Sequence, residues 1–180
     1  IPDAEAFYRQ IQPYLVAGDP TGWDIIVITN GPTLTKLIQL DQLMELPLYA
    51  RTNFDTYAAP EIKDPAYDPG SRFTMPWQSG ITGIAYNPAL TGRPITSLQD
   101  LFSEEFAGRV GMFGDSIDLP NLSLVAAGFD PATSTPDQWA EAADLLRRQR
   151  DEGIVKRYYT QNYVNALANG DVAISMAWSG

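Results

Sequence analysis

The sequence predicts an α/β fold with a mainly parallel sheet. Short continuous apolar runs, several rich in β-branched residues, alternate with segments of helical periodicity. Of the 180 residues, 44% are hydrophobic, which is enough to bury a sizeable core. Alternation of strands and helices along a chain is typical of this fold class.

The first part of the chain predicts the order helix, strand, helix. A first helical pattern consists of Phe7, Ile11, Tyr14 and Leu15. Residues 23–28 (WDIIVI) read as a buried parallel strand. After a turn at 30–33, Leu34, Leu37, Ile38 and Leu40 again follow helical spacing. Residues 47–76 contain five prolines and predict a long surface connection.

The second part of the chain predicts three more strands, at residues 81–86, 109–113 and 172–176. Helices are expected from Ser97, over 122–127, from Thr135 and over 162–168. The helix from Thr135 has the clearest boundaries, because Pro136 suits its first position, Gln138 completes a capping box, and Gly153 ends it.

Charge and composition narrow the possible functions. The formal net charge is −10, which argues against nucleic acid and anionic membranes as partners and suits a cationic ligand. The chain has neither cysteine nor histidine, so thiolate zinc sites and histidine acid–base chemistry are excluded. We expect no cofactor and no metal site. No stretch has the apolar length of a membrane-spanning helix, and no signal peptide starts the chain.

Ligands of open α/β sheets bind beyond the carboxyl ends of the strands. The candidate binding residues near predicted strands are Thr29, Asn30, Trp77, Asp115, Asp118 and Trp178. The two aspartates are three residues apart, so a helical turn places them on one face, where they could bind an ammonium group. The alternative is that they only cap a helix.

The other candidates have equally plain alternatives. Trp77 and Trp178 could form an aromatic wall for a ligand, or could simply be core residues. Thr29 and Asn30 could contact the ligand or only form a turn. Residues 113–117 (FGDSI) also resemble the nucleophile block of GDS-type serine esterases, but Ser116 lacks the histidine base that such enzymes need.

Five motifs, in order over nearly the whole chain, resemble the spermidine/putrescine-binding family of ABC-importer solute-binding proteins. They are residues 22–27 (GWDIIV), 75–87 (MPWQSGITGIAYN), 95–102 (ITSLQDLF), 106–110 (FAGRV) and 169–180 (NGDVAISMAWSG). The resemblance implies a periplasmic-binding-protein-like fold of type II. Its two lobes each have a mainly parallel sheet flanked by helices, and the ligand lies in the cleft between them.

By this resemblance, residues 1–84 are part of the first lobe, 85–176 the second lobe, and 177–180 a return crossover. The first lobe is expected to be incomplete, with family segments absent before Ile1 and after Gly180. Asp115, Asp118 and Trp178 fall on ligand-binding positions of the family, and Trp77, Thr29 and Asn30 on cleft-facing segments. Polyamine binders of the family carry Ser and Tyr where this chain has Thr29 and Asn30.

The resemblance implies a non-enzymatic, extracytoplasmic protein, either periplasmic or a cell-surface lipoprotein. It would bind putrescine or spermidine and deliver it to the permease subunits of an ABC importer. A protein of the same fold that binds another small solute is the alternative, and a serine esterase is a weaker one. Open sheet edges in the incomplete lobe predict a possible dimer.

Overall fold

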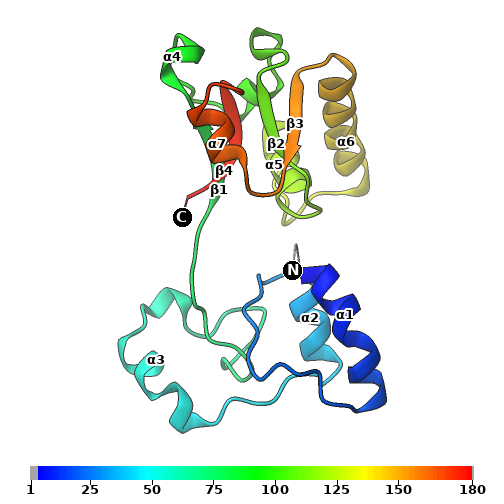
Figure 1. The fold of residues 1–180 in the computed structure, drawn as a ribbon, viewed down its shortest axis with the longest axis vertical. Helices are drawn as coiled ribbons and strands as arrows, with labels where there is room; N and C mark the ends of the chain where they lie inside the picture. Colours follow the sequence, from blue (N-terminus) through cyan, green and yellow to red (C-terminus); the bar gives the residue numbers. More distant parts are fainter. Residues whose placement is uncertain (1–3, 180) are drawn as a thin grey trace. The chain divides into compact units, whose positions relative to one another are not determined.

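The computed structural model describes residues 4–179 (Figure 1). The chain forms two compact units, Ile1–Ser79 and Gly80–Gly180. The predicted lobe boundary at residue 84 lies within strand β1, Thr82–Tyr86, which belongs to the second unit. The assignment of lobes itself stays a prediction. No helix among the described residues is long and apolar enough to cross a membrane.

Two helices form the core of the first unit. They are α1 (Ala4–Ala17) and α2 (Pro32–Gln39), and both were predicted from their apolar spacing. Phe7, Tyr8 and Ile11 of α1 pack with Leu37 of α2, and all four are buried. Pro32 starts α2 at a position where a missing backbone N–H costs nothing.

The prediction of a buried strand at residues 23–28 is wrong. Ile26 and Ile28 pack against the helical cluster, whereas Ile25 and Val27 are 84% and 79% exposed. The side chains therefore alternate as in a strand, but the segment joins no sheet. The described part of the first unit contains no strand, so the backbone of this segment has none to pair with in that unit.

The predicted surface connection at 47–76 is ordered by local contacts. It contains two 3₁₀ turns, Leu48–Arg51 and Pro60–Ile62, and a short helix, α3 (Thr52–Tyr57). The carboxylate of Asp68, only 2% exposed, accepts hydrogen bonds from the backbone N–H groups of residues 72, 73 and 74 and from the Thr74 hydroxyl. One buried acid therefore organises the loop that precedes the second unit.

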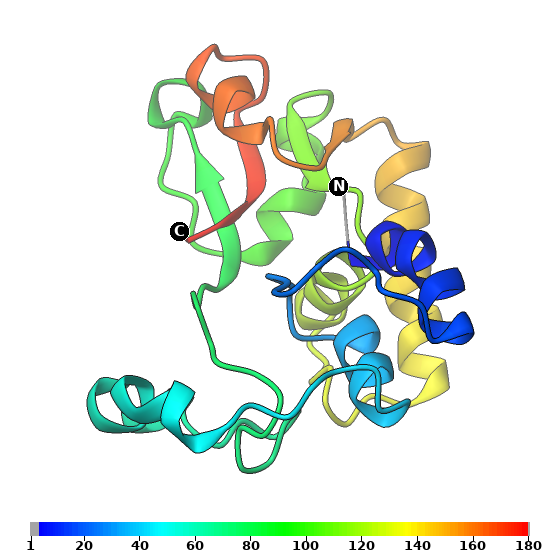
Figure 2. The same cartoon turned by 60° about the horizontal axis from the view of Figure 1, so that its bottom comes forward.

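A four-stranded mixed sheet forms the centre of the second unit, in the order β1-β4-β2-β3 (Figure 2). Its other strands are β2 (Val110–Phe113), β3 (Val155–Tyr159) and β4 (Ile174–Trp178). β4 pairs antiparallel with β1 and parallel with β2, which pairs parallel with β3. Three of the four strands were predicted. β3 was not, because its middle residues are polar and exposed.

Helices cover both faces of this sheet. α5 (Asp118–Ala126) packs on β2, and α7 (Tyr163–Ala168) lies on the other face against β4 (Figures 1 and 2). α6 (Pro136–Asp151) packs on α5 and has the predicted capping box. A short helix, α4 (Pro88–Thr91), and two 3₁₀ turns, Leu98–Phe102 and Glu104–Phe106, fill the connection from β1 to β2.

Close packing between strands depends on one glycine. A Cβ atom at Gly111 of β2 would lie 2.6 Å from Oγ of Ser175 and 3.0 Å from the ring of Tyr159. Any larger residue would therefore displace the side chains of Ser175 and Tyr159, which pack against Gly111 from the neighbouring strands. The core around this point consists of Val110, Met112, Phe113, Ile174 and Met176, among others.

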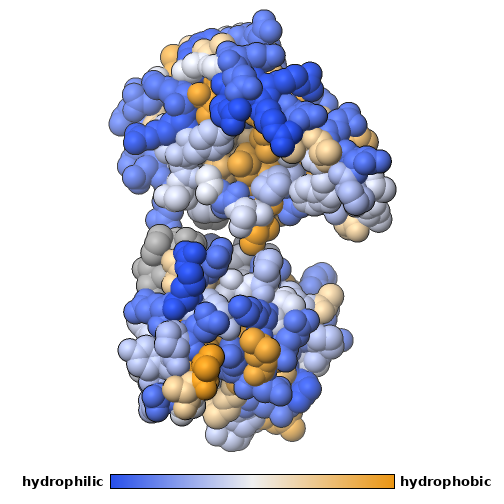
Figure 3. Space-filling view, turned by 90° about the vertical axis from the view of Figure 1, so that its right-hand side faces the viewer, coloured by the Kyte–Doolittle hydropathy of each residue, from blue (hydrophilic) through white to orange (hydrophobic). Residues whose placement is uncertain are grey.

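An ion-pair cluster ties together the connection between β1 and β2. The guanidinium of Arg93 donates to Asp100 over 2.6 Å and to Glu105 over 2.7 Å. The hydrogen bond from Arg93 lowers the pKa of Asp100 below its usual value of 3.8, although burial acts in the opposite direction. The same acids raise the pKa of Arg93 further. On the face shown in Figure 3, the surface is mostly polar, and apolar residues reach it in separate groups in each unit.

Candidate functional site

The carboxylate of Asp118 lies at the carboxyl-end edge of the sheet. Asp118 is the first residue of α5, shortly after β2 ends. Its Oδ2 accepts a hydrogen bond of 2.7 Å from Nε1 of Trp178 and one of 2.9 Å from the hydroxyl of Thr82. Within residues 4–179, its other oxygen, Oδ1, accepts no hydrogen bond. Asp118 and Trp178, both predicted site residues, are thus in direct contact.

Three aromatic rings meet at the same place. Trp178 ends β4 and Phe113 ends β2, and the centres of their rings are 4.5 Å apart. The ring of Tyr163, at the start of α7, meets the indole edge-on at 6.1 Å. The Tyr163 hydroxyl also accepts from the backbone N–H of Trp178 over 3.1 Å. Trp178 remains 42% exposed, so part of its ring is available to a ligand.

Asp115 makes the contacts expected of a helix-start residue. Its Oδ1 accepts hydrogen bonds from the backbone N–H groups of Ile117 and Asp118. Its Oδ2 is buried and has no hydrogen-bond partner among the described residues. These contacts fold the turn before α5, although Ile117, not Asp115, stands at the N-cap position directly before the helix. A role of Asp115 in binding stays a prediction.

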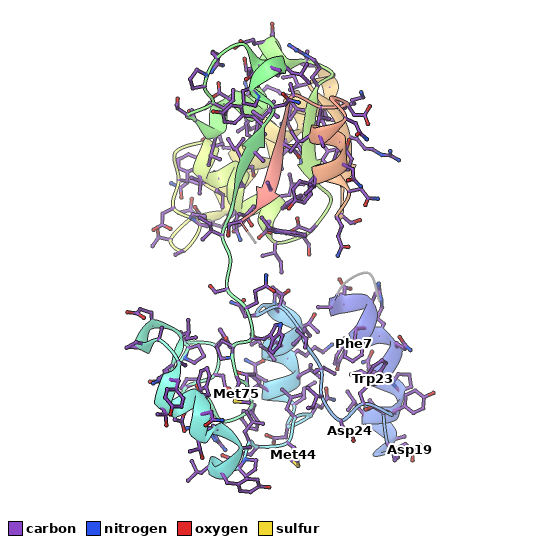
Figure 4. All side chains as sticks on the ribbon, turned by 60° about the vertical axis from the view of Figure 1, so that its left-hand side comes forward. Phe7, Asp19, Trp23, Asp24, Met44 and Met75 are labelled. Atoms are coloured by element: carbon purple, nitrogen blue, oxygen red, sulfur yellow. The ribbon has the colours of Figure 1, made fainter. Side chains whose placement is uncertain are left out.

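The remaining candidates lie in the first unit. Trp77 is 82% exposed, and Thr29 and Asn30 are exposed in the turn before α2. Trp23, which was not a candidate, packs edge-on against Phe7 with ring centres 5.9 Å apart (Figure 4). The part of the site contributed by Trp77, Thr29 and Asn30 stays a prediction.

Sequence reasoning missed Thr82, Phe113 and Tyr163 as parts of this cluster. The sequence candidates lie beyond the carboxyl ends of strands or, for Trp77, in the segment before a strand, whereas Thr82 is the first residue of β1 itself. Because β1 runs antiparallel to β4, its first residue lies opposite Trp178, the last residue of β4. The signal that could identify Thr82 is the antiparallel pairing of the strand at 81–86 with the last strand, which a mainly parallel sheet does not predict.

The cluster offers an acid and an aromatic wall, but no metal centre. Within residues 4–179, no group of three or more histidine, cysteine, aspartate or glutamate side chains could hold a metal ion. Ser116, the nucleophile of the esterase alternative, is exposed, and the sequence contains no histidine to activate it. The carboxylate of Asp118 beside the ring of Trp178 can bind a cationic, partly apolar group.

An α/β unit with such a cluster at its strand ends is typical of small-molecule binding proteins. The chain belongs to the bacterial extracellular solute-binding protein family, whose model matches residues 6–180. The predicted resemblance to this type of protein is therefore confirmed.

Two curated relatives are 28% and 29% identical to the chain over the aligned residues. Spermidine/putrescine-binding periplasmic protein 1 of Haemophilus influenzae is 28% identical over 177 residues, which cover 98% of this chain and 47% of the relative. The putrescine/agmatine-binding protein of Pseudomonas aeruginosa is 29% identical over 174 residues, covering 89% and 46%. The chain spans about half the length of the curated relatives it matches.

Solved structures show the same fold. A putative spermidine/putrescine ABC transporter protein from Listeria monocytogenes superposes with a TM-score of 0.83 at 19% identity, over 100% of this chain and 53% of its own. The spermidine/putrescine ABC transporter substrate-binding protein PotD from Streptococcus pneumoniae gives 0.77 at 23% identity, over 98% and 52%. The predicted periplasmic-binding-protein-like α/β class is thereby confirmed.

Proposed function

We propose that this chain belongs to the polyamine-binding component of an ABC importer. The proposal rests above all on one observation, the contact between the carboxylate of Asp118 and the indole of Trp178 at the sheet edge. The names of the curated relatives support it, since they bind putrescine, spermidine or agmatine. The protein would act outside the cytoplasm, and its partners would be the permease subunits of the importer.

The two side chains suit the two parts of a polyamine. Oδ1 of Asp118 can accept a charge-assisted hydrogen bond from an ammonium group. The exposed part of Trp178 can cover the methylenes, each worth about 0.8 kcal/mol on burial, and a desolvated cation–π contact adds about 2 kcal/mol. Together these terms are compatible with micromolar binding, about −8 kcal/mol.

Asp115 is proposed as a further ligand-binding residue of the second unit, and ligand-binding roles are also proposed for Trp77, Thr29 and Asn30 of the first unit. We propose that the protein is not an enzyme. The family is one of solute-binding proteins, and Ser116 has no histidine partner in the sequence.

Isothermal titration of the protein with putrescine, spermidine and agmatine tests the function. We expect micromolar binding of at least one of them. Asp118→Asn keeps the side-chain shape and an acceptor for Trp178 but removes the charge, so the affinity should fall by a factor of about 30 or more. Glu141→Gln, an exposed charge change on α6, is the matched control and should bind like the wild type.

Two results would contradict the proposal. If none of the three amines produced heat, the polyamine assignment would be wrong, and a thermal-shift screen over other solutes would test the same-fold alternative. If Asp118→Asn bound as tightly as Glu141→Gln, the site would lie elsewhere. Cleavage of a chromogenic ester that is lost in Ser116→Ala would instead support the esterase.

A further inference from the structure

Thr82 occupies a special place in the cluster at the sheet edge. Its hydroxyl donates to Oδ2 of Asp118 over 2.9 Å, and this is the oxygen that also accepts from Trp178 Nε1. Thr82 and Trp178 are direct partners in the antiparallel pairing of β1 with β4. Side chains of directly opposed residues project from the same face of a sheet. Both donors therefore approach one carboxylate oxygen from the same side.

We propose that Thr82 is a positioning residue for the ligand site. It holds the carboxylate of Asp118 against the indole of Trp178, so that acid and ring form one preorganised half-site. This inference rests on the proposed function for its consequence in binding. That Thr82 fixes the indole of Trp178 through Asp118 does not depend on any ligand.

The distribution of hydrogen bonds gives the physical reason. An ionised carboxylate has room for about four hydrogen bonds, two on each oxygen. Thr82 and Trp178 fill Oδ2, which leaves Oδ1 as the oxygen available to an ammonium group. Without the hydroxyl, Oδ2 keeps a single neutral donor, and the carboxylate can rotate away from the indole. Binding would then have to restore an orientation that the free protein already has, and affinity falls when preorganisation is lost.

Position 82 allows a nearly isosteric test. Thr82→Val exchanges the hydroxyl for a methyl group and keeps a β-branched side chain that suits β1. Thr82→Ser keeps the hydroxyl and removes the methyl. Thr91→Val is the matched control, because it deletes a hydroxyl that bonds to the backbone carbonyl of Arg93, also in the second unit.

The first measurement is the Nε1–H resonance of Trp178 in ¹⁵N NMR spectra of the ligand-free chain, assigned with Trp178→Phe. We expect Thr82→Val to shift this resonance and to speed its hydrogen exchange about tenfold, as expected for loss of one hydrogen bond to a charged group. Thr82→Ser should resemble the wild type, and Thr91→Val should leave the resonance in place.

The second measurement is putrescine and spermidine affinity by calorimetry. Thr82→Val should weaken binding about tenfold and Thr82→Ser less than about threefold. In an Asp118→Asn background the effect of Thr82→Val should largely disappear, because Thr82 acts through that carboxylate.

Several results would overturn the inference. An unchanged indole resonance in Thr82→Val would do so, whatever the affinity, and so would an effect on affinity that persists fully in Asp118→Asn. If Thr82→Val did not fold, Thr82→Ala would replace it as the variant without the hydroxyl. An indole resonance shifted as far in Thr82→Ser as in Thr82→Ala would then contradict the inference. Absence of polyamine binding in the wild type would refute the proposed function but not the positioning role, which the indole signal tests independently.

Discussion

Four aspartates illustrate how differently one residue type can act in this chain. Asp68 and Asp115 accept hydrogen bonds from the backbone and organise a loop and a helix start. Asp100 is paired with Arg93, and Asp118 is bonded to an indole and a hydroxyl. Asp115 and Asp118 each keep one oxygen without a bond from the described residues, but that of Asp115 is buried, whereas Asp118 is bonded to the exposed ring of Trp178. The contacts of Asp118 therefore make it the stronger ligand candidate of the two acids, while Asp68 and Asp100 have structural partners on both oxygens.

The three-residue spacing of Asp115 and Asp118 predicts that the two acids lie close together. It does not predict which groups each of them contacts. A three-residue interval is equally compatible with a cap and with a ligand pair. The difference depends on Thr82 and Trp178, which are 36 and 60 residues away in the sequence from Asp118. Contacts over such intervals are determined by strand pairing, which residue patterns near the acid do not contain.

Acid should destabilise the second unit through Asp100. Its pKa is lowered in the folded protein by the hydrogen bond from Arg93, so its contribution to stability is present at neutral pH. This contribution is lost as the pH falls below the unfolded value of about 3.8, through the lower folded pKa. Urea unfolding between pH 7 and pH 2 should show the free energy of unfolding decreasing over this range.

Asp100→Asn provides the check on this pH dependence. The variant should be less stable than the wild type at pH 7, and the difference should shrink towards pH 2 as Asp100 becomes protonated in the wild type. Asp137→Asn, which removes an exposed acid from the start of α6, is the control. A stability difference between Asp100→Asn and wild type that did not change with pH would show that the Arg93 pair contributes nothing.

At the scale of segments, residues 23–28 expose large apolar side chains although they belong to no sheet. One set of alternate side chains packs on α1 and α2, and the other, Ile25 and Val27, is in solvent. Extended backbone without a strand partner favours pairing with another strand. We therefore expect the 180-residue chain to self-associate as its concentration rises, and Val27→Lys to reduce this, because a charge on an exposed strand opposes edge pairing.

Light scattering after size-exclusion chromatography measures this association directly. Lys63→Glu, a charge change outside the segment, serves as the comparison variant. A chain that stays monomeric at every concentration, or one in which Val27→Lys associates as strongly as the comparison variant, would disprove the role of the segment.

The elements differ in how well the sequence predicts them. α6 was predicted because Thr135, Pro136, Gln138 and Gly153 are local signals that act within a few residues. Residues 23–28 have the composition of a buried strand, but a strand also needs neighbours, and composition does not supply them. β3 was missed for the opposite reason. Its backbone pairs with β2, but Lys156 and Arg157 give it the composition of an exposed polar segment.

For the molecule as a whole, the two units differ in their cores. The second unit has a sheet with helices on both faces and a large buried cluster, whereas the first buries Phe7, Tyr8, Ile11 and Leu37 between two helices. We expect residues 80–180, expressed alone, to unfold in one cooperative transition, and residues 1–79 alone to unfold at much lower urea concentration.

Circular dichroism and amide NMR spectra of the two fragments measure this difference. Dispersed resonances and a sharp urea transition are expected for residues 80–180. Broad, poorly dispersed spectra from that fragment would mean that its sheet depends on the first unit. The intact 180-residue chain is the reference for both.

The pairing of Thr82 with Trp178 also determines how the second unit could be inserted into another protein. Ile81 and Ser179 are joined by two hydrogen bonds, so the first and the last described residues of the second unit's sheet region lie side by side. Directly opposed residues of antiparallel strands lie only about 5 Å apart, as at the base of a hairpin. Residues 80–180 therefore form an insertable module, which a host protein could accept in place of a hairpin turn without separating its own flanking strands.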